Sequence, residues 1–165
     1  MKPETKTPER EKFEHYSKGW QSIQSQEPRT KFRTWEGDSN PPSGSLPAQI
    51  AHKLVSELWP DQKMAMHYRL LEAYFSENRT ISDWEVLAEL VSEIGEDPSY
   101  FLEKVDERKS DLASLTIEEH NEAVGQGITA VPTTLINRVL PVPGAQESET
   151  YITWIERIIE RSQNT

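Results

Sequence analysis

The chain has 165 residues, a length that suits one domain with a modest core. Its 28 Asp and Glu outnumber its 18 Lys and Arg, and the formal charge of −10 argues against a nucleic acid partner, because it repels phosphate. It has no cysteine, which excludes disulfide bonds, thiolate nucleophiles and cysteine-ligated zinc. No apolar run of about 18 residues predicts a membrane span and no secretion signal is visible, so we expect a cytoplasmic protein.

The first residues, 1–8, are polar and interrupted by proline, which predicts a flexible lead-in. A helix is then expected from Glu9 onward, because large aromatic residues follow at spacings of three and four. These residues are Phe13, Tyr16 and Trp20.

From residue 24 to residue 44 the helical period disappears among prolines and glycines. A loop of this length is unusual inside a small domain. We therefore expect it to be packed by its two aromatic residues, Phe32 and Trp35, or to be shaped for a site.

Apolar residues at helical spacing then predict a helical region. Helices are expected from Ser45 to Pro60, over 61–78, from Ser82 to Gly95, from Asp97 onward, and over 110–125. In the second of these, the expected buried stripe is Met64, His67, Tyr68, Leu71, Tyr74 and Phe75. The next should begin with a capping box made by Ser82 and Glu85. Gly95 suits a helix end, and Asp97-Pro98 suits a new start.

The end of the chain has a different pattern. Residues 133–137 are rich in β-branched side chains and predict a strand, which could pair with 139–142 across a turn at Asn137-Arg138. A final helix is expected over 147–161. The domain organisation we predict is a lead-in at 1–8, a helical region at 9–125, and a ββα half at 126–165.

Four phrases in this order resemble the DsbA-like thioredoxin family, and more narrowly its cytoplasmic FrnE-like branch of disulfide oxidoreductases or isomerases. They are residues 35–47, 70–83, 119–133 and 143–146. The resemblance implies a helix-dominated α/β protein. Its fold would be a partial thioredoxin-like one, with the family's helical insertion and a C-terminal β-hairpin followed by a helix.

The resemblance also implies a substrate-contacting loop with a cis bond before Pro132. We carry over Ala130, Val131 and Pro132 as residues that contact an extended peptide or a thiol substrate. The chain departs from the family in its redox half. Members begin with a strand, a Cys-x-x-Cys helix start and a second strand, and none of these precedes the first helix here. We therefore expect no catalytic residue, metal or cofactor, and no redox activity from this chain alone.

Without those strands, the strand at 133–137 would present a bare edge, and two strands alone are marginal. Three explanations are open. The coding region could begin inside a longer gene, a strand-completing partner or a homodimer could supply the edge, or helices could cover it. We favour the first.

Two other functions are open. One is a non-catalytic peptide-binding or chaperone-like module. The other is a relative of the kappa-class glutathione transferases and isomerases, which share the helical insertion but carry a Gly-Gln-Asp-Arg-like turn where this chain has residues 144–147. The four histidines lack metal-binding spacing, and His67 is expected in the core.

Overall fold

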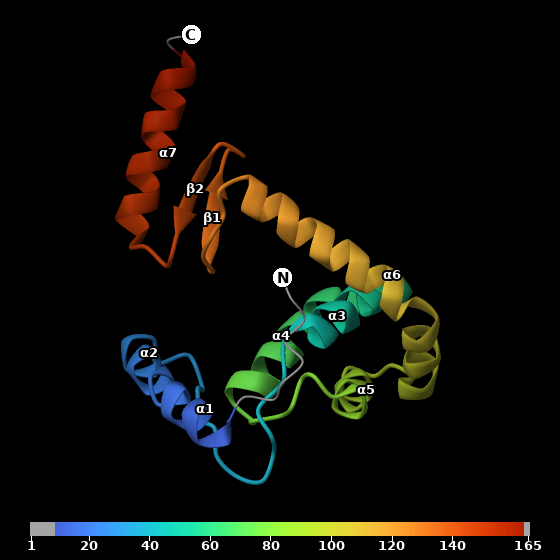
Figure 1. Ribbon diagram of the computed structural model, residues 1–165. Coiled ribbons are helices and arrows are strands. Elements are labelled where there is room, and N and C mark those ends of the chain that lie inside the picture. Colours follow the sequence, from blue (N-terminus) through green and yellow to red (C-terminus); the bar gives the residue numbers. More distant parts are fainter. Residues whose placement is uncertain (1–8, 164–165) are drawn as a thin grey trace. The chain divides into compact units, whose positions relative to one another are not determined.

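The computed structural model describes residues 9–163, so the predicted lead-in at 1–8 lies outside the described residues. The chain forms two compact units, one ending at Ile117 and the other beginning at Glu118 (Figure 1). The elements are α1 (Arg10–Ser17), α2 (Trp20–Gln26), α3 (Leu46–Leu58), the 3₁₀ turn η1 (Pro60–Gln62), α4 (Lys63–Phe75), α5 (Trp84–Glu93), α6 (Pro98–Gly125), β1 (Thr133–Ile136), β2 (Leu140–Pro143) and α7 (Ser148–Gln163). None of the described helices is long and apolar enough to cross a membrane.

The core of the first unit lies among α3, α4, α5 and the first turns of α6. Aliphatic side chains dominate it, and the largest fully buried members include Leu54, Met66, Leu87, Leu90, Phe101 and Leu112. Burying such side chains is worth about 1.5–3 kcal/mol each, so this cluster supplies most of the hydrophobic stabilisation of the unit.

The buried face of α4 differs from the predicted stripe. Met66, Leu70 and Ala73 are buried, whereas Met64, Tyr68 and Leu71 are exposed, and so is His67. The prediction of a core histidine is therefore wrong. Both faces of α4 carry apolar side chains. The face with Met66, Leu70 and Ala73 is the one that packs against the neighbouring helices α3 and α5.

His67 nevertheless has a neighbour on α3, because its ring centroid lies 5.7 Å from that of His52. Burial lowers the pKa of His52 below its usual 6.5, and the positive charge that His67 can carry lowers it further. A depressed folded-state pKa means that the stabilisation is present above pH 6.5 and is lost as pH falls through the folded-state pKa.

We therefore expect the urea concentration at the midpoint of unfolding to be lower at pH 5 than at pH 7.5. The His52→Gln variant should lose part of this pH dependence. Urea titrations monitored by circular dichroism at both pH values measure it. His15→Gln, on the exposed surface of α1, is the control and should keep the dependence of the parent chain. If the urea midpoint of His52→Gln changed with pH as much as that of the parent chain, His52 would not be the source of the dependence.

Three predicted helix boundaries need correction. The first helix is broken at Lys18-Gly19 into α1 and α2, so that α2 extends into the predicted loop. The cap of α5 is Asp83, whose carboxylate accepts the backbone N–H of Glu85, so the capping box at Ser82 is wrong by one residue. The two helices expected from Asp97 onward and over 110–125 are one 28-residue helix, α6.

The long loop that follows α2 is packed by its aromatic residues. Trp35 is fully buried, and its ring meets that of Phe13 edge-to-face at 5.3 Å. Asn78, just after α4, adopts φ of 57° and donates its side-chain N–H to the carbonyls of Thr34 (2.9 Å) and Glu36 (3.4 Å). The loop is therefore held from both sides by buried polar and aromatic contacts.

The second unit contains the end of α6, the β1–β2 hairpin and α7. The strands are antiparallel, with Thr134 opposite Val142, and positive φ at Asn137 and Arg138 makes the tight turn that was predicted between them. Val142 is fully buried. α7 packs back on the hairpin, with the Tyr151 hydroxyl 3.3 Å from that of Thr134.

Candidate functional site

The predicted substrate loop lies immediately before β1 in the second unit. The peptide bond between Val131 and Pro132 is cis. The Val131 side chain is 93% exposed, the highest value among the large hydrophobic residues of the described chain. Gly144 N–H donates to the carbonyl of Pro132 at 2.7 Å, and Thr133 Oγ1 donates to that of Ala130 at 2.5 Å. The three residues are thus anchored at the start of the strand while one apolar side chain points to solvent.

The hydrogen bonds of the hairpin show which backbone groups of β1 are free. The bond from Gly144 to Pro132 and the pairing of Thr134 with Val142 set the alternation along both strands. The backbone groups of Thr133 and Leu135 consequently point away from β2. No described residue pairs with them, so β1 is an edge strand with an available row of donors and acceptors.

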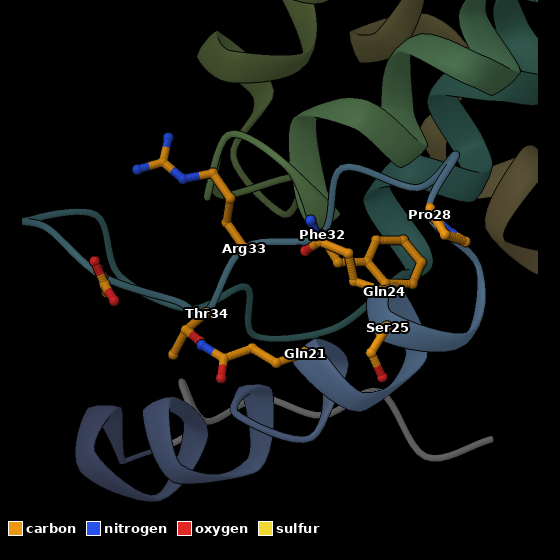
Figure 2. Close-up of a pocket in the computed structure, with 8 residues that line it drawn as sticks. Gln21, Gln24, Ser25, Pro28, Phe32, Arg33 and Thr34 are labelled. Carbon is orange, nitrogen blue, oxygen red and sulfur yellow. The ribbon is translucent and has the colours of Figure 1, made fainter.

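A second candidate lies in the first unit, in the long loop. A hollow of about 660 Å³ lies between α2 and the extended segment that follows it (Figure 2). Its lining is Gln21, Gln24, Ser25, Pro28, Phe32, Arg33, Thr34 and Glu36. Its floor includes Phe32, whose ring stacks near Phe75 at a centroid distance of 4.9 Å.

Hydrogen bonding fixes part of this hollow. Gln21 Nε2 donates to Thr34 Oγ1 at 2.9 Å, and the backbone N–H of Arg33 donates to the carbonyl of Phe75 at 2.8 Å. In Figure 2 the Arg33 guanidinium extends away from the Phe32 ring. The lining offers amide and hydroxyl groups together with the charged side chains of Arg33 and Glu36, and such groups can form hydrogen bonds with a polar ligand.

The structure brings Ala130, Val131 and Pro132 together at one strand start, as their adjacency in the chain requires. The hollow was not predicted residue by residue. The only sequence signal for it was the length of the loop at 24–44. The described residues hold no group of three or more His, Asp or Glu residues that could bind a metal ion.

Known structures include one with the same fold over nearly the whole chain. The cytosolic disulfide reductase DsbM from Pseudomonas aeruginosa is similar with a TM-score of 0.67 and 18% identity, covering 99% of this chain and 82% of that chain. At this identity the likeness shows the fold, and it confirms the predicted helix-dominated, partial thioredoxin-like α/β class. A comparison with curated proteins returned no match.

The sequence itself gives the family. Residues 45–155 match the family described as the DSBA-like thioredoxin domain. The match begins at the start of α3, includes the loop before β1 and extends into α7. It spans about two thirds of the sequence, and this chain therefore belongs to the DSBA-like thioredoxin domain family.

Proposed function

We propose that this chain is a cytoplasmic, FrnE-like member of the family that binds an extended peptide or a thiol substrate at Ala130, Val131 and Pro132 without performing thiol–disulfide exchange. The observation that carries the binding role is the exposed Val131 at the start of an edge strand. An extended peptide can pair with such an edge through its backbone and gain specificity from an adjacent apolar side chain.

The absence of exchange follows from the composition. Exchange begins with attack of a thiolate on a disulfide sulfur, and the chain has no cysteine to supply one. We expect no reduction of insulin above the background rate of the reductant when the purified chain is added. Turnover in this turbidity assay would contradict the redox inactivity while leaving the peptide-binding role untouched.

Replacing Val131 by aspartate should weaken the binding of an extended apolar peptide at least tenfold, because a carboxylate replaces the exposed apolar contact and adds charge to an acidic chain. Fluorescence anisotropy with a fluorescein-labelled ten-residue Ala/Val peptide measures the affinity. Val139→Asp is the matched control, since Val139 is 77% exposed at the other end of the same hairpin. Equal affinities for the two variants would place the binding elsewhere.

The same variants separate the glutathione-transferase alternative. A calorimetric titration with glutathione is expected to show no saturable heat. Saturable binding that is lost in Val131→Asp would favour a relative of the kappa-class enzymes over a peptide-binding module.

A further inference from the structure

A pocket of about 720 Å³ lies in the second unit, between the end of α6 and the turn of the hairpin. Its lining consists of Glu122, Gln126, Leu135, Arg138 and Val139, and we call it the hairpin pocket. All of these residues belong to the same compact unit. The volume falls within the range of about 300–1,000 Å³ that is typical of small-molecule sites.

The alternation of side chains along β1 shows which face of the hairpin the pocket occupies. The Thr134 hydroxyl contacts Tyr151 of α7, and Leu135 is the next residue of the same strand. Because successive side chains of a strand point to opposite faces, Leu135 points away from α7. The hairpin pocket therefore lies on the face of the hairpin opposite α7, and a ligand there does not compete with that helix.

Arg138 has two properties that the turn alone does not explain. It adopts φ of 59° directly after Asn137, which adopts φ of 52°. Two-residue turns of this kind favour glycine at the second position, because a side chain is strained at positive φ. The Arg138 guanidinium also has no ion pair with another residue of 9–163, although the chain contains 28 Asp and Glu. A strained and unpaired arginine in a pocket points to a role in binding.

The other lining groups define what Arg138 can bind. A guanidinium binds a carboxylate through two parallel N–H bonds. Leu135 and Val139 are exposed and add apolar surface to the same pocket. Gln126 Nε2 donates to Glu122 Oε1 at 3.1 Å, which orients a carboxylate within the lining. That carboxylate repels a second negative charge and accepts hydrogen bonds from an ammonium group.

We infer that the hairpin pocket binds a small apolar zwitterion, the chemistry shared by a free apolar amino acid and a short apolar peptide. The ligand carboxylate binds Arg138, and the ligand ammonium group binds Glu122. The apolar side chain of the ligand packs on Leu135 and Val139. The formal charge of −10 favours a zwitterion over a simple anion, because the field of the chain repels a net negative ligand and not a neutral one.

This site goes beyond the proposed function, since the residues proposed to contact a peptide are not part of its lining. Calorimetric titration of the full chain with L-leucine and with the dipeptide Leu-Leu, at about 50 mM salt, tests it. Saturable binding of at least one of the two is expected, and the tighter one identifies the source of the ligand. The absence of saturable binding of both would overturn the proposal.

Two blocked compounds test the zwitterion itself. N-acetyl-leucine lacks the ammonium group and leucinamide lacks the carboxylate, so each should bind about tenfold more weakly than leucine. Blocked compounds that bind as tightly as leucine would overturn the proposal, because the apolar side chain alone would then account for the affinity.

Variants of the two charged residues locate the site. Arg138→Gln should weaken binding about tenfold, whereas Arg157→Gln, on the exposed surface of α7, is the matched control and should keep the affinity of the parent chain. Glu122→Gln should weaken the binding of leucine and strengthen that of N-acetyl-leucine, because it removes both the attraction for an ammonium group and the repulsion of a carboxylate. Equal affinities of Arg138→Gln and Arg157→Gln for leucine would overturn the proposal.

Arg138→Gly separates binding from folding. Glycine is the favoured residue at this position of the turn, so the variant should unfold at a urea concentration equal to or above that of the parent chain. It should nevertheless bind leucine about tenfold more weakly, since the guanidinium is lost. A glycine variant with the affinity of the parent chain would show that Arg138 does not bind the ligand.

Discussion

Replacing Trp35 by alanine is expected to lower the free energy of unfolding by about 3–5 kcal/mol, the usual cost of deleting a buried aromatic side chain. The Trp35 side chain is fully buried, and its Nε1 donates to the carbonyl of Ser39 at 3.1 Å. Its backbone N–H donates to the buried Ser17 Oγ at 2.8 Å. Truncation leaves a cavity under the loop, which adds to the loss of the buried apolar contacts.

Urea unfolding followed by circular dichroism measures this effect. Tyr16→Ala is the control from the same aromatic group, because the Tyr16 side chain is 65% exposed and its ring contacts Phe13 at 6.0 Å. It should cost about 1 kcal/mol or less. Similar midpoints for the two variants would show that Trp35 does not hold the loop.

The second large effect is expected at Phe101 in α6. Its side chain is fully buried in the core cluster, and Phe101→Ala should cost about 3–5 kcal/mol. Tyr100→Ala, one residue earlier on the same helix, is the matched control. Tyr100 is 42% exposed, with the Lys104 ammonium 5.4 Å from its ring centroid, so its loss should cost about 1 kcal/mol.

Thermal and urea unfolding of the pair distinguish core packing from helix propensity, since alanine improves the propensity of α6 at both positions. A loss at Phe101→Ala as small as that at Tyr100→Ala would mean that α6 is not anchored through this residue. The difference between the two variants is more informative than either value, because the unfolded chains are nearly alike.

The class of fold and most helix positions could be predicted because their signals are local. Gly95 follows the end of α5 with φ of 91°, as a glycine at a helix end predicts. The Asp97 carboxylate accepts the backbone N–H groups of Ser99 and Tyr100, as the Asp97-Pro98 pair at a helix start predicts. The hairpin turn at Asn137-Arg138 could also be predicted, because two short β-rich runs flank it and asparagine adopts positive φ more readily than most residues.

Features that depend on tertiary packing could not be predicted in this way. Hydrophobic period alone does not choose between the two apolar faces of α4, and the face with Met66 is buried because of what α3 and α5 present to it. Likewise, α6 crosses a polar stretch at 106–111 without a break. That stretch contains no glycine or proline, so the loss of apolar residues there marked a change of exposure and not an end of the helix.

The two candidate sites also differ in whether the sequence alone could locate them. Ala130, Val131 and Pro132 are contiguous and came from a family resemblance, so no folding was needed to bring them together. The hollow near Phe32 joins Gln21 of α2 to Thr34, which lies 13 residues later. Polar residues of this kind have no periodic pattern, and only the path of the loop makes them neighbours.

The hydrogen bonds of Asn78 couple the opening of the loop to the opening of the chain at the end of α4. The segment from Thr30 to Ser45 has no secondary structure of its own, so the protection of its amides depends on tertiary bonds such as those from Arg33 N–H to the Phe75 carbonyl and from Trp35 N–H to Ser17 Oγ. Opening of the last turn of α4 would release the carbonyls of Thr34 and Glu36 together. We therefore expect the loop and that turn to open together in hydrogen exchange, although more than 40 residues separate Asn78 from the two carbonyls it binds.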